Sequence, residues 1–254
     1  MTDLRLGDCL EVMKLIPSGS IDAIITDPPY GTTACKWDSV IDFDLMWEQL
    51  NRIIKPNGAI VLFGSEPFSS ALRMSNIKNY KYDWIWIKNR GTGHLNAKKM
   101  PMKYHENILI FYKKLPTYNP IFIEYSESTK KIHTSNKVKT FDEKWVNKNK
   151  IYGNFKKLER NYDFKRGKYP MNYLNFDVLS QTDKTRVHPT QKPIALMEYL
   201  IKTYTNENET VLDFTMGSGS TGVAAKNLNR NFIGIEQDEN YFHIAENRIN
   251  NFNK

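Results

Sequence analysis

The fold class is indicated by the stretch Thr210-Val211-Leu212-Asp213-Phe214-Thr215-Met216-Gly217-Ser218-Gly219-Ser220-Thr221-Gly222. It begins as a short apolar run typical of a buried strand, passes through a glycine-rich loop and leads into a helix predicted over about 220–228. Glycines in such a loop permit positive φ angles, and the start of the helix offers N–H groups to an anion. A strand, loop and helix at the carboxyl edge of an α/β sheet form the usual site for a nucleotide-like ligand. No Gly-Lys-Ser or Gly-Lys-Thr follows the loop, which disfavours a P-loop.

The next predicted strand, 232–235, ends at Glu236, which follows Asp213 by 23 positions. In dinucleotide-binding folds, an acidic residue about 20 positions after the loop holds the ribose hydroxyls. The alternative is that Glu236 is an acidic helix cap near the surface. Asp238 is the predicted N-cap of the final helix, and Pro193 is expected in the first turn of an earlier one.

Residues 1–112 show the same alternation of strands and helices. Elements are predicted at 21–26, 43–54, 59–63, 67–74, 82–87 and 107–112, and a shorter strand precedes Gly7-Asp8. This spacing predicts a doubly wound, mostly parallel α/β sheet. The loop from Lys88 to His94 is expected at the end of one of these strands.

A middle block from about 115 to 185 lacks this alternation of strands and helices. Its scattered aromatic residues favour a separate small module over a disordered linker. The stretch 113–170 has 15 Lys or Arg and 6 Asp or Glu, so it carries the whole excess of the formal net charge of +8. Such an excess is typical of a segment that binds a polyanion, and a solvated Lys- and Asn-rich surface is an equal alternative. The predicted division is therefore 1–114, an insert at 115–185, and 186–254.

The overall composition is that of an ordinary globular protein, because the 254 residues are 40% hydrophobic and 25% charged. No apolar run reaches the roughly 18 residues of a membrane helix, and residues 1–5 lack the apolar core of a signal peptide. Cys9 and Cys35 are too few for a disulfide framework, and neither they nor the histidines show the spacing of metal ligands. We therefore expect a cytoplasmic protein with no membrane partner and no metal.

The segment Asp27-Pro28-Pro29-Tyr30 directly follows the predicted strand at 21–26. The two prolines make a stiff turn that would hold a carboxylate, a free backbone carbonyl and an aromatic ring in a fixed relation. Two acceptors and a ring face suit the amino edge of a planar heterocycle, because they can accept both N–H bonds of an exocyclic amine while the ring is stacked. A purely structural Pro-Pro turn is the alternative.

Three motifs, in this order, resemble those of the β-class of amino-DNA methyltransferases. They are Asp27-Pro28-Pro29-Tyr30, His188-Pro189-Thr190-Gln191-Lys192-Pro193 and the glycine-rich loop at 213–219. In that family the catalytic motif precedes, and the cofactor loop follows, a target-recognition insert. The resemblance covers nearly all of the chain except the middle block. It implies a seven-stranded, Rossmann-like methyltransferase sheet formed by both outer segments, with an insert that recognises double-stranded DNA.

The resemblance also implies which residues bind the cofactor S-adenosylmethionine. Asp8 and the amide of Cys9 would contact its adenine, and Glu236 would hold its ribose hydroxyls. The methionine end would be bound or enclosed by His188, Thr190, Lys192, Phe214, Gly217, Ser218, Gly219 and Thr221. Asp27 and Asp213 complete the implied cofactor set, and Asp27, Pro28, Pro29 and Tyr30 are the implied catalytic residues.

The implied reaction is methyl transfer to the N6 amine of adenine in a specific DNA sequence. Hydrogen bonds from both amine protons, to the Asp27 carboxylate and the Pro28 carbonyl, would favour a tetrahedral nitrogen and aim its lone pair at the methyl group. A base inside a duplex cannot reach such a pocket, so it must be flipped out, with Tyr30 stacking on it. The loop from Lys88 to His94 would approach the flipped strand.

Several alternatives stay open at this point. Asp in the first position of the catalytic motif is usual for adenine-N6 enzymes of the family and Ser for cytosine-N4 enzymes, so adenine is favoured. Cytosine N4 in DNA and an amine on RNA are the other substrates, and a catalytically silent DNA-binding subunit is the alternative from another class. A homodimer and a cognate restriction enzyme are further partners compatible with a bacterial or phage-encoded member of this family.

Overall fold

The computed structural model describes residues 1–32, 38–133, 165–180, 183, 186–187 and 190–251. The chain divides into two compact units, one made of Met1–Asn119 with Asn172–Lys254 and the other of Pro120–Met171. The smaller unit is thus shorter at both ends than the insert predicted at 115–185. Within the described ranges, no helix combines the length and the apolar character that a membrane span requires.

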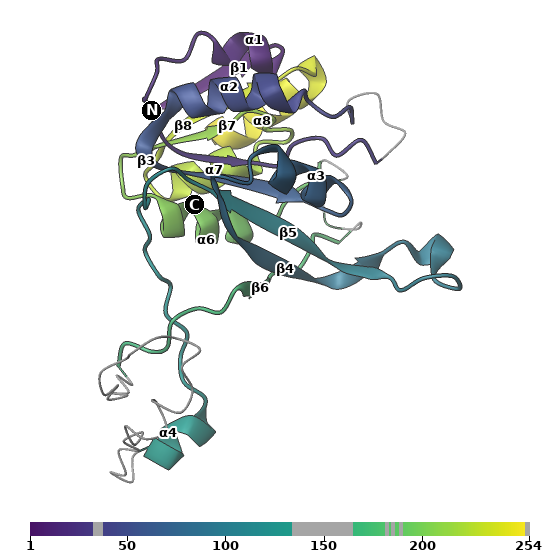
Figure 1. The fold of residues 1–254 in the computed structure, drawn as a ribbon, viewed down its shortest axis with the longest axis vertical. Coiled ribbons are helices and arrows are strands. Elements are labelled where there is room, and N and C mark those ends of the chain that lie inside the picture. Colours follow the sequence, from purple (N-terminus) through teal and green to yellow (C-terminus); the bar gives the residue numbers. More distant parts are fainter. Residues whose placement is uncertain (33–37, 134–164, 181–182, 184–185, 188–189, 252–254) are drawn as a thin grey trace. The chain divides into compact units, whose positions relative to one another are not determined.

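The larger unit is built on one sheet, in which the described residues form eight strands (Figure 1). Their order is β1 (Thr2–Leu6), β8 (Asn231–Glu236), β7 (Thr210–Asp213), β2 (Ile21–Thr26), β3 (Ile54–Gly64), β5 (Lys103–Phe111), β4 (Tyr80–Thr92) and β6 (Tyr173–Asn175). β5 runs antiparallel to both of its neighbours, and the other neighbouring pairs are parallel. The predicted mostly parallel α/β sheet is confirmed.

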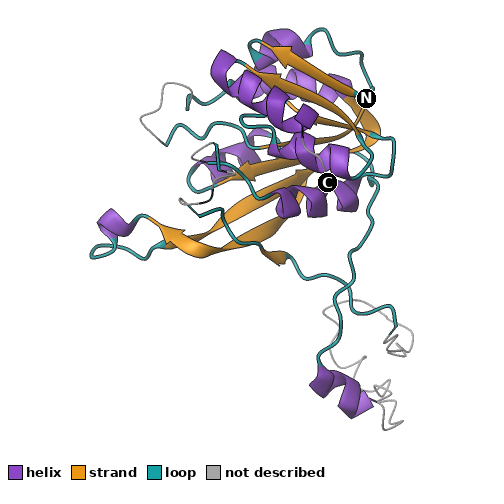
Figure 2. Ribbon diagram, turned by 180° about the vertical axis from the view of Figure 1, so that it is seen from behind, coloured by secondary structure: helices purple, strands orange, loops and turns teal. Residues whose placement is uncertain are grey.

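Helices cover both faces of this sheet (Figures 1 and 2). Side chains alternate along a strand, so Ala23 and Ile25 of β2 belong to one buried cluster and Ile24 to the other. The first cluster includes residues of α6 (Ile194–Tyr204), α7 (Ser220–Asn227) and α8 (Glu239–Asn251). The second includes residues of α1 (Cys9–Met13), α2 (Phe43–Ile53) and α3 (Phe68–Ser75). This is the doubly wound arrangement that the sequence predicts.

The expectation of seven strands is wrong by one. β6 adds to the free edge of β4 in parallel, with Tyr173 opposite Ile85. The indole of Trp86 also donates a hydrogen bond to the Phe176 carbonyl at 2.8 Å. A strand of three residues has no periodic pattern to reveal it, so this segment falls within the insert predicted at 115–185.

The parallel strands place four acidic residues at one edge of the sheet. β2 ends at Thr26, immediately before Asp27, and the next strand in the sheet, β7, ends at Asp213. β8 ends at Glu236, which is level with Leu6 at the end of β1, two residues before Asp8. Because the carboxyl ends of parallel strands meet at the same edge, this is the expected position of a ligand site.

The described part of the smaller unit contains one helix and one bridge. α4 spans Glu127–His133, and its start is capped by the Ser126 hydroxyl, which accepts a hydrogen bond from the Thr129 N–H. Ile123 and Lys168 pair as an isolated antiparallel bridge. Arg166 packs its guanidinium over the Phe122 ring at 4.3 Å, which explains how some of the scattered aromatic and basic residues fit together.

Candidate functional site

A cavity of about 1080 Å³ opens at the carboxyl edge of the sheet in the larger unit. Its walls come from the loops after β1, β2, β7 and β8 and from the β4–β5 pair. The predicted site residues in these walls are Asp8, Cys9, Asp27, Pro28, Pro29, Tyr30, Thr190, Lys192, Asp213, Phe214, Gly217, Ser218, Thr221 and Glu236. Gly219 is not in the walls but precedes α7 with a φ of 78°. His188 lies outside the described residues.

Asp213 is buried beneath the glycine-rich loop and is surrounded by hydroxyl groups. Its carboxylate accepts hydrogen bonds from the hydroxyls of Thr26, at 3.0 Å, and Thr221, and from the Thr215 N–H at 3.2 Å. Burial raises the pKa of Asp213 to about 7, although these donors act against the shift. Through these hydrogen bonds Asp213 joins the ends of β2 and β7 next to the start of α7, and it thereby supports the glycine-rich loop.

Glu236 binds the glycine-rich loop from the neighbouring strand. Its Oε2 accepts the Gly217 N–H at 2.8 Å, and its Oε1 accepts the N–H groups of Gln237 and Asp238 at 2.9 Å. Burial raises the pKa of Glu236 despite these bonds. The carboxylate therefore lines the cavity and also accepts the N–H groups of the two residues that precede α8, and its role in holding ribose hydroxyls stays a prediction.

Asp8 is the N-cap of α1 at the same end of the cavity. Its Oδ1 accepts hydrogen bonds from the backbone N–H groups of Leu10, at 2.9 Å, and Glu11, at 3.2 Å. The adjacent Cys9 is buried, and burial raises the pKa of its thiol to about 12. Cys9 is therefore a neutral thiol at physiological pH and not a nucleophile.

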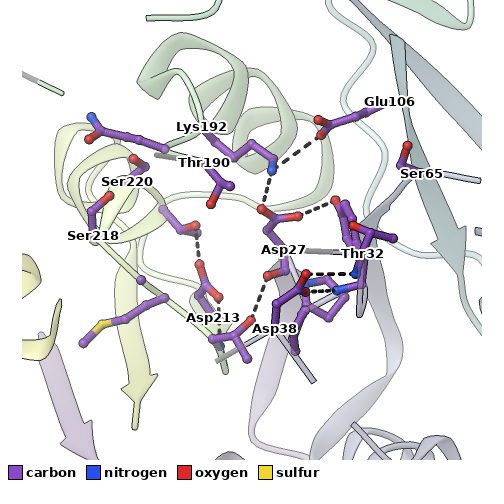
Figure 3. A pocket seen from close by; sticks show the side chains of 18 of the residues that line it. Asp27, Thr32, Asp38, Ser65, Glu106, Thr190, Lys192, Asp213, Ser218 and Ser220 are labelled. Carbon is purple, nitrogen blue, oxygen red and sulfur yellow. Dashed lines mark hydrogen bonds and ion pairs between the residues drawn. The ribbon is translucent and has the colours of Figure 1, made fainter. Parts of the chain in front are cut away.

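The Asp27 motif lines another part of the cavity, next to Asp213, which we call the Asp27 end (Figure 3). The Asp27 carboxylate accepts hydrogen bonds from the Tyr30 hydroxyl and from the Lys192 ammonium, and burial raises its pKa while Lys192 acts against that shift. The Thr215 hydroxyl donates to the Asp27 carbonyl at 3.1 Å, which ties the motif to the glycine-rich loop. The Tyr30 ring stacks on Phe68 with centroids 5.0 Å apart. The structure thus brings the two predicted motifs into direct contact.

Asp38 supports this motif and was missed by the sequence analysis. Its carboxylate accepts hydrogen bonds from the backbone N–H groups of Tyr30, Gly31 and Thr32, at 2.8 to 2.9 Å (Figure 3). Gly31 has a φ of 67°, which glycine adopts without strain. Asp38 therefore fixes the turn that follows the prolines. Nothing in its spacing marks it, because the contact depends on where the folded chain places Asp38.

Lys192 connects Asp27 to a second buried carboxylate, Glu106 in β5. The Lys192 ammonium is 3.5 Å from Glu106 Oε2, and the Lys88 ammonium donates to Glu106 Oε1. Burial disfavours the charged forms of Glu106 and Lys192. The neighbouring charges act in the opposite direction, because Lys192 and Lys88 lower the pKa of Glu106, and Asp27 and Glu106 raise the pKa of Lys192. Negative and positive groups therefore alternate along the row Asp27, Lys192, Glu106 and Lys88. The signal that could have revealed Glu106 is a charged residue two positions before the apolar run 108–111.

The pair β4 and β5 extends beyond the sheet as a hairpin that carries the short helix η1 (His94–Asn96) (Figure 1). Residues 87–105 include five Lys or Arg and no Asp or Glu. Lys88, Arg90 and Lys103 line the cavity from this hairpin. β4 continues through Thr92, so much of the loop predicted at 88–94 is strand. The Asp27 end of the cavity is thus bordered by positive charge.

Taken together, the cavity offers two differently equipped ends within one volume. Its volume lies at the upper limit of the range of about 300–1,000 Å³ that is typical of small-molecule sites, so it has room for a large ligand. The glycine-rich loop, Glu236 and Asp8 form one end, and Asp27, Tyr30, Lys192 and Glu106 form the other. This arrangement suits the transfer of a group between two bound molecules.

Comparison with known proteins agrees with this geometry. The family model described as DNA methylase, of the N6/N4 methyltransferases, matches residues 21–247. The chain is 30% identical over 265 residues to the type II methyltransferase M.HpaI of Haemophilus parainfluenzae, covering 97% of this chain and 74% of that protein. It is 29% identical to the DNA adenine methyltransferase YhdJ of Escherichia coli, covering 96% and 81%.

Solved structures show the same fold. A complex of M1.HpyAVI with S-adenosylmethionine matches with a TM-score of 0.63 and 29% identity, over 98% of this chain and all of that one. The cytosine-N4-specific PvuII DNA methyltransferase matches with a TM-score of 0.68 at 17% identity, which is a likeness of fold alone. The extent of the family match and the identity to M.HpaI establish that this chain belongs to the N6/N4 family of DNA methylases.

Proposed function

We propose that this protein transfers the methyl group of S-adenosylmethionine to the N6 amine of adenine in a specific sequence of double-stranded DNA. The observation that carries the proposal is the contact between the two motifs in one cavity, where Thr215 of the glycine-rich loop donates to the Asp27 carbonyl at 3.1 Å. A donor molecule on the loop and an acceptor amine at Asp27 would therefore be neighbours.

The residues at the loop end fit S-adenosylmethionine in size and in chemistry. The carboxylates of Glu236 and Asp8 are acceptors for the ribose hydroxyls and for the adenine edge, and the backbone of Gly217 and Ser218 lines the cavity beside them. The bound cofactor supplies an electrophilic methyl group. The role of the chain is to hold that molecule with its methyl group toward Asp27 and to exclude water from the space between them.

The Asp27 end fits the acceptor amine. Its carboxylate and the Pro28 carbonyl are two acceptors on a stiff turn, and Asp38 and Phe68 hold the following Tyr30 in place. If both amine protons donate to these acceptors, the nitrogen lone pair is directed at the methyl group. Tyr30, which lines the cavity, is the ring on which the base would stack.

DNA would approach from the hairpin side, because Lys88, Arg90 and Lys103 border the Asp27 end and can neutralise phosphates. The target base must leave the duplex to reach Asp27. The basic stretch 113–170 has the charge expected of a further DNA contact, and we propose that it takes part in target recognition. Such a protein acts where bacterial DNA lies, in the cytoplasm.

Two observations favour adenine over cytosine as the target base. The first residue of the catalytic motif is Asp, and YhdJ, which is named an adenine methyltransferase, is 29% identical to this chain. The cytosine-specific PvuII enzyme shares the fold at only 17% identity.

The test is to sequence DNA from cells that express the protein by a method that reports modified bases. We expect N6-methyladenine in one sequence context, and mass spectrometry of nucleosides after incubation with labelled cofactor should show the same product. N4-methylcytosine would refute the choice of base. Binding of the cofactor without methylation of any DNA would instead identify a silent DNA-binding subunit.

A further inference from the structure

Both carboxylate oxygens of Asp27 already have donors (Figure 3). Oδ1 accepts the Tyr30 hydroxyl, and Oδ2 accepts the Lys192 ammonium. The proposed function requires this carboxylate to accept an N–H of the target amine as well. Because the Lys192 side chain is only 9% exposed and packs against Asp27, the ammonium stands where an incoming amine would approach Oδ2. A carboxylate oxygen can accept more than one hydrogen bond, but an amine that approaches Oδ2 from the side of Lys192 can bind only if the ammonium moves aside.

Glu106 is a second hydrogen-bond acceptor within reach of the Lys192 ammonium. Its Oε1 is bound by Lys88, whereas its Oε2 is buried and has no hydrogen-bond partner among the described residues. Oε2 lies 3.5 Å from the Lys192 ammonium. An N–H···O bond needs about 2.7–3.2 Å, so a movement of less than about 1 Å completes it.

The energetics favour this exchange over a simple loss of the Asp27 contact. A buried ammonium that leaves its carboxylate is strongly destabilised unless another charge receives it. Glu106 is that charge, and its unmet acceptor is itself a cost that the new bond removes. The row Asp27, Lys192, Glu106 and Lys88 therefore has a second arrangement in which Lys192 still faces a carboxylate, while Asp27 accepts hydrogen bonds from Tyr30 and from the amine.

We propose that Glu106 is a positioning residue that draws Lys192 away from Asp27 when the target amine enters. The inference rests on the proposed function and deepens it. In the exchange Lys192 keeps its proton and no covalent bond changes. The ammonium donates to Glu106 Oε2, Asp27 Oδ2 accepts the amine, and the Tyr30 hydroxyl remains on Oδ1. The alternative is that Tyr30 leaves Asp27 instead, in which case Glu106 has no part in the reaction.

The experiment compares Glu106→Gln with a matched control, Asp22→Asn. Asp22 pairs with Lys55 at 2.6 Å, its side chain is 13% exposed like that of Glu106, and it lies at the opposite end of β2 from Asp27. The probe is a DNA duplex that carries the site found by sequencing. We expect Glu106→Gln to slow single-turnover methyl transfer at least about tenfold and to leave the cofactor Kd within about twofold. Asp22→Asn should retain the wild-type rate.

A double variant tests whether Glu106 acts through Lys192. In a Lys192→Met background, Glu106→Gln should add less than about a twofold loss, because there is no ammonium left to move. An equal loss in both backgrounds, or a wild-type rate for Glu106→Gln alone, would overturn the proposal. If Glu106→Gln lowers the Tm so far that the rate cannot be compared, Glu106→Asp, which keeps the charge, should be faster than Glu106→Ala, and equal rates for those two would refute it.

These results are separable from a failure of the proposed function. If the wild-type protein methylates no DNA, the function and the positioning role fall together, and that outcome is visible before any variant is made. If the wild type is active and the variants behave as independent, additive changes, only the role of Glu106 is lost.

Discussion

The two ends of the cavity hold their carboxylates in different ways. At the loop end, Asp213 and Glu236 accept hydrogen bonds from hydroxyls and backbone N–H groups, whose positions are set by the fold. At the other end, Asp27 is bound by the ammonium of Lys192, a charge on a flexible stem. The first arrangement is suited to keep one geometry, and the second can exchange partners. Carboxylates in the same cavity can therefore differ in function, because one end holds them with fixed donors and the other with a donor that can move.

The largest effect should come from removing the Asp27 carboxylate. Asp27→Ala is expected to reduce methyl transfer by a factor of about 10² or more, because the amine loses an oriented acceptor in a water-poor site. The cofactor Kd should stay close to that of the wild type, since Glu236 and the glycine-rich loop are untouched. Single-turnover kinetics and calorimetric titration measure the two quantities. A parallel loss of both would show that the two ends are not independent.

The pH dependence of stability tests the loop end. The pKa of Asp213 is about 7 when folded and near 4 when unfolded, so the unfolded state releases its proton first as the pH rises. The free energy of unfolding should therefore fall between about pH 4 and pH 7, by up to about 4 kcal/mol from this group. Asp213→Asn cannot titrate and should lose less stability between pH 5 and pH 8. Identical slopes in denaturant titrations would contradict the raised pKa.

Glu236 tests whether the loop end retains the cofactor. Glu236→Ala should weaken binding of S-adenosylmethionine by about 1–3 kcal/mol, the scale of hydrogen bonds to a charged group. At saturating cofactor the rate of methyl transfer should be near that of the wild type, in contrast to Asp27→Ala. Calorimetry measures the affinity, and an unchanged Kd would remove Glu236 from the cofactor site.

The smallest effects should come from exposed cations on the hairpin beside the Asp27 end. Lys98→Ala and Lys99→Ala should each weaken DNA binding modestly and reduce the slope of log K against log salt by about one. Lys14→Ala removes a cation that pairs with Glu11 on α1, at the loop end, and serves as the control. Fluorescence titrations over a range of salt concentrations measure the slopes. A flat salt dependence in the wild type would refute an electrostatic DNA contact by this hairpin.

Much of the site could be predicted because its residues are adjacent in sequence to strong local signals. The two prolines after Asp27 end the strand at 21–26 and hold the Asp27 carboxylate at the strand's end. The glycines after Asp213 mark a turn before a helix. Parallel pairing then forces the ends of β2, β7 and β8 to one edge. Element positions, the sheet class and the placement of Asp27, Asp213 and Glu236 at one edge follow from such local patterns.

Asp38, Glu106 and β6 could not be predicted in the same way. Asp38 binds the backbone of the turn that follows Asp27, and Glu106 reaches Lys192 across a sheet whose strand order places β5 beside β3. β6 is too short for a periodic signal. Each depends on tertiary packing and not on a local pattern.

Most elements and the motifs that end them can be predicted from the amino-acid sequence, because turns, caps and apolar periodicity act over a few residues. Which charges face one another depends on the packed fold, because the burial that makes the contact between Asp27, Lys192 and Glu106 strong exists only once distant strands have packed.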